Sequence, residues 1–307
     1  MLRAVAGGNA RCAAMASLLL VCIPLSGGQD DRISVDVNLV VLHATVTDQH
    51  GRLVSDLGEQ EFQVYENGVR QQIKLFKHED VPVTAGLLVD HSGSMKRKLH
   101  EVSAAARAFV QASNPDDEMF VVNFNEHVES GLPDTVRFTS DPGKLEQAIS
   151  RAPATGMTAL YDAIAVALRH LQSGSREKKV LLAISDGGDN ASLHKLPQIL
   201  KLAEQSSAII YTVGIFDEDD TDRNPGVLKK LAAATGGIAF FPKELNEVTG
   251  ICTRIAKDIR NQYTIGYAPS EPARPGEYRT IRVTASASHH GKLSVRTRAG
   301  YRAGDQQ

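Results

Sequence analysis

A short apolar run that ends abruptly in oxygen-bearing side chains is the feature that most constrains this chain. Residues 84–89 lack a polar face, as expected for a buried strand of a parallel sheet. Asp90, Ser92 and Ser94 follow the run directly. In open α/β sheets, ligands bind at the carboxyl ends of the strands. Carboxylate and hydroxyl oxygens at that position favour a hard cation such as Mg²⁺.

Strand and helix patterns alternate through residues 82–261. Further strands are expected at 119–124, 180–184, 208–215 and 238–241, with a short edge strand at 135–138. Amphipathic helices are expected within 99–110, 144–150, 160–171, 195–205, 227–234 and 245–259. This alternation predicts an α/β fold with a doubly wound, mostly parallel sheet and helices on both faces. The segment has neither a Gly-x-Gly-x-x-Gly motif nor a phosphate-binding loop, which argues against nucleotide binding.

Both flanks of this segment are predicted to be β-structure. In the first flank, Ile33, Val35, Val37, Leu39 and Val41 alternate with polar residues, and residues 62–76 have the pattern of a hairpin around Asn67-Gly68. In the second flank, strands are expected at 263–267, 278–285 and 293–297. Neither flank is large enough to bury its own apolar face. We therefore expect the two flanks to pair into one β-sandwich, rather than to form separate appendages.

The amino-terminal segment has the pattern of a secretory signal peptide. Arg3 and Arg11 precede an apolar run that ends at Leu25, and small residues follow it. An uncleaved anchor is the alternative. The expected organisation is therefore a signal peptide at 1–28, a β segment at 29–81, the α/β domain at 82–261, a second β segment at 262–303 and a tail at 304–307. It predicts a secreted protein or one of the periplasm or cell envelope.

Composition excludes some classes of function. The formal net charge is −2 and charged residues make up 23% of the chain, so nothing suggests a nucleic-acid-binding protein. Cys12 and Cys22 lie in the predicted signal peptide, which leaves Cys252 without an internal disulfide partner. We expect Cys252 to be a small core residue of the last helix.

Two further loops follow predicted strands or precede a predicted helix at the same edge of the sheet. Thr158 precedes the helix that carries Asp162, and Asp186 and Asp189 directly follow the strand at 180–184. A topological switch next to the first strand would bring all of these loops into one crevice. Five side chains then form a candidate cation site: Asp90, Ser92, Ser94, Thr158 and Asp186. Because hydroxyls are neutral, a cation held there keeps electrophilic character and an open position for an outside carboxylate.

At these residues the chain resembles the von Willebrand factor type A domain family. The family's metal-ion-dependent adhesion site (MIDAS) consists of Asp-x-Ser-x-Ser, a later Thr and a later Asp, which match Asp90 to Ser94, Thr158 and Asp186. The resemblance implies that the hydroxyls coordinate Mg²⁺, with Mn²⁺ or Ca²⁺ as alternatives. It also implies that the two Asp residues act largely through water, and that a Glu or Asp of a protein partner completes the shell. The flanks resemble a bacterial secreted subgroup of such proteins.

Several neighbouring residues have two interpretations. Asp162 and Asp189 are candidates for supporting the ligands, and Asp162 is equally well explained as a solvated carboxylate. The acidic residues Asp217, Glu218, Asp219 and Asp220 follow a strand at the same end of the sheet. They could bind a second ion or select a partner, but a solvated loop is the favoured interpretation. Five arginines of the second flank are expected to face outward: Arg279, Arg282, Arg296, Arg298 and Arg302.

The leading hypothesis is a metal-dependent adhesion module without enzymatic activity, binding a protein that presents Glu or Asp. A Mg²⁺-dependent hydrolase of phosphate or ester groups is the first alternative. It would need a general base, and His91 is the candidate visible near the loops. A structural module, in which the metal only stabilises the fold, is the second alternative.

Overall fold

The computed structural model describes residues 39–217 and 222–303. The predicted signal peptide and the tail lie outside the described residues, as do residues 218–221. Among the described helices, none combines the length and apolar character needed to cross a membrane.

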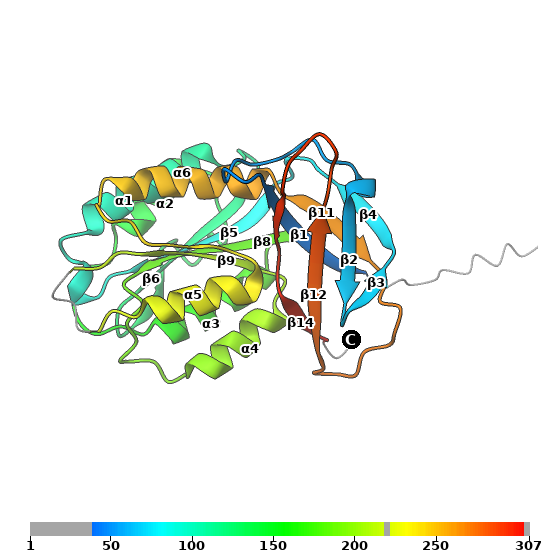
Figure 1. Ribbon diagram of the computed structural model, residues 1–307. Coiled ribbons are helices and arrows are strands. Elements are labelled where there is room, and N and C mark those ends of the chain that lie inside the picture. The colour runs from blue at the N-terminus through cyan, green and yellow to red at the C-terminus, as the bar shows by residue number, and fades with distance from the viewer. Residues whose placement is uncertain (1–38, 218–221, 304–307) are drawn as a thin grey trace, which may run out of the picture. The chain divides into compact units, whose positions relative to one another are not determined.

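A six-stranded sheet forms the centre of the α/β part (Figure 1). Its strand order is β10-β9-β8-β5-β6-β7. The bounds are β5 Val83–Asp90, β6 Glu118–Phe124, β7 Val128–Ser130, β8 Lys178–Ser185, β9 Ile209–Gly214 and β10 Ala239–Phe240. All neighbours are parallel except β7, which pairs antiparallel with β6.

Helices cover both faces of this sheet. In Figure 1, α1 Leu99–Ala112, α2 Pro142–Ile149 and α6 Glu247–Arg260 lie on one face. On the other face lie α3 Leu160–Gln172, α4 Leu196–Gln205 and α5 Pro225–Thr235. Short 3₁₀ turns span Glu59–Glu61 and Gly93–Met95. The predicted doubly wound α/β fold is therefore confirmed.

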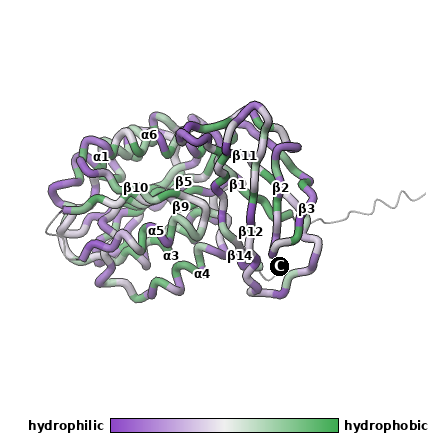
Figure 2. The backbone as a smooth tube through the Cα atoms, in the orientation of Figure 1, coloured by the Kyte–Doolittle hydropathy of each residue, from purple (hydrophilic) through white to green (hydrophobic). Residues whose placement is uncertain are grey.

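The apolar character of the central strands explains their position. Every residue of β5 and of β8 is buried, and Figure 2 shows the apolar colour concentrated in the strands between the helix layers. Strands buried on both faces need apolar side chains at consecutive positions, which is the pattern of these two segments. Cys252 is fully buried in α6, as expected for a core residue.

The edge strand lies elsewhere than predicted. Residues 135–138 form no strand; the edge is β7, at Val128–Ser130. The chain reverses immediately after β6, where the Asn125 amide donates to the His127 carbonyl and the Asn125 side chain accepts from the His127 amide. This tight reversal lets β7 pair with β6 at once. The apolar residues Val136 and Phe138 pack against the core without pairing as a strand.

The two flanks form the predicted composite β-sandwich (Figure 1). One sheet has the order β13-β1-β11-β4 and the other β14-β12-β2-β3, so each contains strands from both flanks. The first-flank strands are β1 Val40–Thr47, β2 Phe62–Glu66, β3 Val69–Gln71 and β4 Ile73–Lys77. The second-flank strands are β11 Tyr263–Tyr267, β12 Tyr278–Ala285, β13 Ser294–Arg296 and β14 Gly300–Arg302. Strand β14 was not predicted from the sequence.

The first strand buries the opposite set of residues from the set predicted. Leu39 and Val41 are 39% and 43% exposed, whereas Leu42, Ala44 and Val46 are almost fully buried. The apolar alternation changes phase at Val40-Val41, and a shift of one residue turns a strand's other face to the core. Pairing of β1 with β11 fixes the face that is buried. Residues 33–37 of the predicted strand lie outside the described residues.

The predicted hairpin around Asn67-Gly68 exists, but its second arm divides. Asn67 and Gly68 have φ values of 48° and 82°, as a type I′ turn requires. Strand β3 pairs with β2, and β4, which follows after Gln72, pairs with β11 in the other sheet. The second arm therefore crosses between the two sheets and helps to close the sandwich.

The prediction of outward-facing arginines is correct for Arg282 and wrong for Arg279, which is 3% exposed. The Arg279 guanidinium pairs with the equally buried Glu66 and donates to the carbonyls of Glu271 and Pro272. Glu66 also accepts hydrogen bonds from the hydroxyls of Tyr267 and Tyr301. Glu66 is separated from Tyr267, Arg279 and Tyr301 by 201, 213 and 235 positions, so this buried network joins the two flanks.

The three remaining arginines join the sandwich to the α/β part. Arg296 pairs with Asp258 of α6, which also accepts a hydrogen bond of 2.6 Å from the Tyr211 hydroxyl. Arg298 donates to the Glu204 carbonyl, and Arg302 pairs with the Glu204 carboxylate. These half-buried arginines are therefore contacts between the sandwich and the helices rather than free surface charges.

We predict that Arg279→Met destabilises the protein by about 3–5 kcal/mol, because it leaves the Glu66 carboxylate buried without its cation. Arg282→Met is the matched control: Arg282 is exposed on the same strand and lies over the Tyr65 ring. Its loss should cost under about 1 kcal/mol. Urea unfolding of both variants measures the difference; equal destabilisation would contradict this interpretation of Glu66.

Candidate metal centre

The candidate site begins at the carboxyl end of β5, the strand that lies between β6 and β8. The chain leaves β5 toward β6 on one side, and later returns to form β8 on the other side. Such a switch point leaves a crevice beyond the strand ends. Asp90 ends β5 and Asp186 immediately follows β8, so the fold places both carboxylates beside this crevice.

The Asp90 carboxylate is fully buried and lies in a tight polar environment. Its Oδ1 accepts a hydrogen bond of 2.8 Å from the Ser92 amide, and its Oδ2 accepts one of 2.6 Å from the Ser185 hydroxyl. These two bonds fix the orientation of the carboxylate. The role of Ser185, which directly precedes Asp186, was not predicted from the sequence.

The two serine hydroxyls and Asp186 are in direct contact. The Ser94 hydroxyl donates to Asp186 Oδ2 at 2.5 Å, and the hydroxyl oxygens of Ser92 and Ser94 are 3.1 Å apart. Ser92 and Asp186 are each 2% exposed, whereas Ser94 is exposed. The site therefore has a buried acidic floor and one side open to solvent.

Thr158 comes from the loop before α3, and this loop packs against the serine loop through its backbone. The Gly93 amide donates to the Gly156 carbonyl at 3.1 Å, and the Thr155 amide donates to the His91 carbonyl at 2.9 Å. Gly156 has φ of 81°, in the left-handed region that favours glycine, and a Cβ there would also displace the Glu126 carboxylate. Glu126 accepts from the Met157 amide, which orients the residue before Thr158.

The loop after β8 fixes Thr158 from the other side. The Asn190 side chain accepts from the Thr158 amide at 2.9 Å, and the Asn190 and Ala191 amides both donate to the Thr158 carbonyl at 3.0 Å. Neither Asn190 nor Glu126 was predicted from the sequence, because each accepts a hydrogen bond from the backbone amide of a distant residue.

Asp162 and Asp189 connect the same two loops. Asp162 accepts from the amides of Leu193 and His194 and from the His194 ring. Asp189 accepts from the Tyr161 amide at the start of α3 and from the Ser192 hydroxyl. In this structure both carboxylates hold the loops around Thr158 together, and Asp162 is thus not merely solvated.

The donor set fits a hard divalent cation. Burial, and then the neighbouring Asp186 charge, raise the pKa of Asp90 to about 6. The hydrogen bonds to the two carboxylates therefore do not fully compensate their negative charge at the crevice. Hydroxyl and carboxylate oxygens are the ligands that Mg²⁺ prefers. Asp90, Ser92, Ser94 and Asp186 are brought together around this point, and Thr158 is anchored beside them; together they would hold the ion.

His91 is not positioned as a base for this crevice. Its side chain is almost fully buried and lies beside the Asn123 side chain. Burial lowers the pKa of the His91 ring below its usual range. A ring enclosed in the domain cannot contact a substrate above the serine loop.

Asp217 is the described residue of the predicted acidic loop; Glu218, Asp219 and Asp220 lie outside the described residues. The Asp217 carboxylate lies 3.4 Å from the nitrogens of both Arg97 and the buried Lys98. Lys98 also donates to the Ile215 carbonyl. The charge of Asp217 is thus partly compensated by protein cations.

The family model of the von Willebrand factor type A domain matches residues 86–188, which include all five predicted ligands. No curated protein matches the chain. A solved structure of a von Willebrand factor type A protein from Catenulispora acidiphila has a TM-score of 0.54 at 16% identity, covering 80% of this chain and 73% of that one. This likeness supports the fold.

Two other solved structures are less similar. BatB from Bacteroides thetaiotaomicron has a TM-score of 0.47 at 16% identity, covering 58% of this chain and 98% of that one. Proximal thread matrix protein 1 from the mussel byssus, with a zinc-occupied MIDAS motif, has a TM-score of 0.49 at 15% identity, covering 59% and 49%.

We predict that Asp90→Asn stabilises the metal-free protein at pH 8 by about 1–3 kcal/mol, since two pKa units correspond to at most about 3 kcal/mol. The pKa of Asp90 in the folded protein, about 6, lies above the ordinary aspartate pKa of 3.8. Protonation of Asp90 therefore favours the folded state. This contribution to the free energy of unfolding is complete below pH 3.8 and is lost as the pH rises through about 6. Asparagine removes the charge. Its Oδ1 can still accept from the Ser92 amide, and its NH2 group can donate to the Ser185 hydroxyl oxygen.

Urea unfolding in EDTA at pH 5 and pH 8 measures this effect. The gain from Asp90→Asn should be larger at pH 8, and added Mg²⁺ should then stabilise the wild type but not the variant. A variant that is less stable than the wild type in EDTA at pH 8 would contradict the charge excess at the site.

Proposed function

We propose that the von Willebrand factor type A domain carried by this chain binds a protein partner through a divalent cation. Domains of this family commonly use a MIDAS for protein interactions, and the matched segment contains the complete motif. In the proposal, Mg²⁺ is held by Asp90, Ser92, Ser94, Thr158 and Asp186, with Mn²⁺ or Ca²⁺ as alternatives. A Glu or Asp side chain of the partner completes the shell.

The difference in exposure within the site is the observation that carries the proposal. Asp90, Ser92 and Asp186 are buried, whereas the adjoining Ser94 is exposed. A site enclosed on all sides would serve only the fold. A site with a buried floor and an open side leaves room for an oxygen from another molecule.

The neutral and the charged side chains of the site have different roles in the proposal. The hydroxyls of Ser92, Ser94 and Thr158 are neutral ligands, so they leave positive charge on the ion. Asp90 and Asp186, oriented by their hydrogen bonds, balance part of that charge from below. The bound ion supplies an electrophilic point that attracts a carboxylate oxygen.

Two apolar side chains extend the proposed binding surface. Met157 precedes Thr158 and is 53% exposed, and Leu193 lies in the loop after β8 and is 88% exposed. The Met157 amide donates to Glu126 and the Leu193 amide donates to Asp162, so hydrogen bonds hold the backbone from which these side chains project. A partner that covered them would gain apolar burial around its carboxylate.

The position of His91 favours binding over hydrolysis. A hydrolase at this site would need a general base near the open side of the crevice. His91, the base considered from the sequence, is buried and faces Asn123 instead. We propose that the domain acts without turnover. With the pattern of a signal peptide at residues 1–28, we also propose that it acts outside the cytoplasm, secreted or in the cell envelope.

Capture of a partner should depend on Mg²⁺ and on partner carboxylates. The immobilised protein is incubated with envelope or extracellular extract in Mg²⁺ or in EDTA. We expect Asp90→Asn to abolish capture, and Asp134→Asn, at an exposed site, to leave it unchanged. Amidating the carboxylates of the extract should also abolish it. Equal capture in EDTA would refute the proposed function.

Leu193→Ser and Met157→Ser should each weaken binding of the captured partner by roughly tenfold, the equivalent of about 1.4 kcal/mol, because apolar contact area is lost. Stabilisation by Mg²⁺ should remain. Leu202→Ser, which changes an exposed leucine on α4, is the control. Calorimetric titration with the purified partner measures the three affinities; unchanged affinity in both test variants would place the partner elsewhere.

A further inference from the structure

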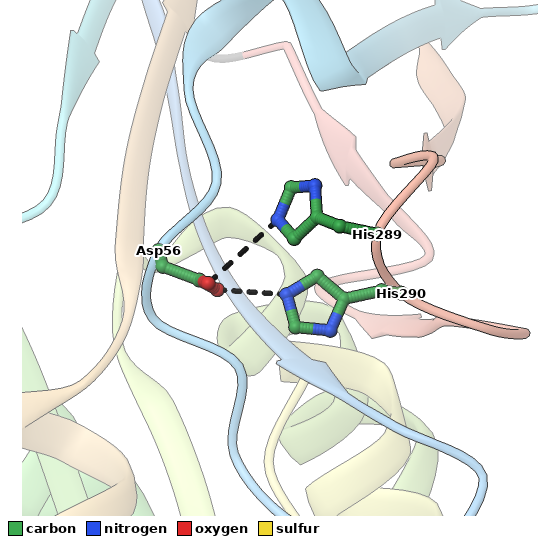
Figure 3. A group of neighbouring side chains, drawn as sticks. All are labelled: Asp56, His289 and His290. Carbon is green, nitrogen blue, oxygen red and sulfur yellow. Dashed lines mark hydrogen bonds and ion pairs between the residues drawn. The ribbon is translucent and has the colours of Figure 1, made fainter.

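A second group of metal-binding side chains lies on the β-sandwich, separate from the crevice of the parallel sheet. Asp56, His289 and His290 direct their polar atoms toward one another (Figure 3). One ligand atom from each residue lies within 4.8 Å of the other two. Asp56 belongs to the first flank and the two histidines to the second, so the group joins distant parts of the chain.

The core of the sandwich fixes the position of Asp56. Its neighbours Val54 and Leu57 are 6% and 5% exposed. The Tyr263 hydroxyl accepts from the Leu57 amide and donates to the Val54 carbonyl, both at 3.1 Å. Asp56 itself is exposed between these two anchors, so its carboxylate is presented to solvent from a constrained backbone.

The histidine pair lies in the connection between β12 and β13, which is also anchored. The Ser286 amide donates to the Glu61 carbonyl at 3.0 Å, and the His290 amide donates to the Ala287 carbonyl at 3.2 Å. The first bond attaches the connection to the first flank, and the second closes a turn. The turn brings both histidine rings to the side where Asp56 lies (Figure 3).

The distances are close to those of a tetrahedral metal site. His290 Nε2 lies 2.9 Å from Asp56 Oδ1, and His289 Nε2 lies 3.7 Å from Asp56 Oδ2. For bonds of about 2.0–2.1 Å, tetrahedral ligand atoms are about 3.3 Å apart. These two separations lie on either side of that value. The three ligand atoms lie within 4.8 Å of one another, so the exposed side chains would draw closer together around an ion.

The ligand types select a transition metal rather than Mg²⁺. Two imidazole nitrogens with one carboxylate oxygen suit Zn²⁺, whereas Mg²⁺ prefers oxygen ligands alone. The His289 and Asp56 side chains are 55% and 61% exposed, and that of His290 is 24% exposed. Such exposure leaves a fourth position open to water.

We propose that Asp56, His289 and His290 bind a divalent transition-metal ion, Zn²⁺ in the first instance, which cross-links the two flanks of the β-sandwich. Both histidines coordinate through Nε2 and Asp56 through a carboxylate oxygen. The ion replaces the contact between Asp56 and His290 as the connection between the residue 53–58 segment and the β12–β13 turn. This site is independent of the proposed partner-binding site.

The test is a zinc titration of the full chain in excess Mg²⁺, read by competition with a chromogenic zinc chelator. The wild type is compared with His290→Ala, Asp56→Asn and the control His100→Ala, which removes a histidine 94% exposed on α1. We expect one Zn²⁺ per wild-type chain. We expect the affinity to fall in both test variants by at least the roughly 10- to 100-fold that loss of an outer-shell partner costs, and to stay unchanged in the control.

Two further measurements keep the outcome unambiguous. Circular dichroism establishes that the variants are folded, and Zn²⁺ should raise the midpoint of thermal unfolding in the wild type but not in His290→Ala. In an Asp90→Asn background zinc binding should persist, which separates this proposal from the function of the crevice. Zinc binding lost in Asp90→Asn, or equal in the wild type and His290→Ala, would overturn the proposal, as would no binding at all. The last result would leave Asp56 and His290 as a hydrogen-bonded pair only.

Discussion

The burial of one carboxylate at the end of β5 is the constraint on which the rest of the site depends. Asp90 is fully buried, and the second carboxylate, Asp186, raises its pKa further. A charge in this position is costly unless it is compensated. The Ser92 amide and the Ser185 hydroxyl supply part of the compensation. A bound cation would supply the remainder, so the same feature that destabilises the metal-free domain favours ion binding.

A rigid set of loops surrounds that carboxylate. The serine loop and the loop before α3 are joined by a backbone hydrogen bond from Gly93 to Gly156. The loop before α3 is joined to the loop after β8 by Asn190, Asp162 and Asp189. Each of these hydrogen bonds involves at least one backbone group. The positions of the loops therefore depend on their backbones and not only on the side chains that would bind the ion. This preorganisation reduces the entropy that a partner's binding would cost.

The sequence predicted the central sheet well because continuous apolar runs have few alternatives. Asp90 and Asp186 lie at one edge of the sheet as predicted, because the carboxyl ends of parallel strands meet there. Thr158 reaches this edge from the loop before α3 instead. The sequence could not predict which face of β1 is buried. The alternation of apolar and polar residues changes phase at Val40-Val41, and pairing with β11 determines which side chains face the core. It also misassigned Arg279, because the partner that allows its burial, Glu66, lies 213 residues away. The role of Asn190 could not be predicted for a similar reason, because its side chain accepts a hydrogen bond from the Thr158 amide in another loop.

The most direct test of the central claim is crystallographic. Crystals grown with Mn²⁺ in place of Mg²⁺ would locate the ion by its anomalous scattering. The account predicts a peak beyond the end of β5, bonded to the hydroxyl oxygens of Ser92, Ser94 and Thr158, with Asp90 and Asp186 close by. An ordered serine loop with no peak at this position at saturating Mn²⁺, or with the ion bound only elsewhere, would contradict it.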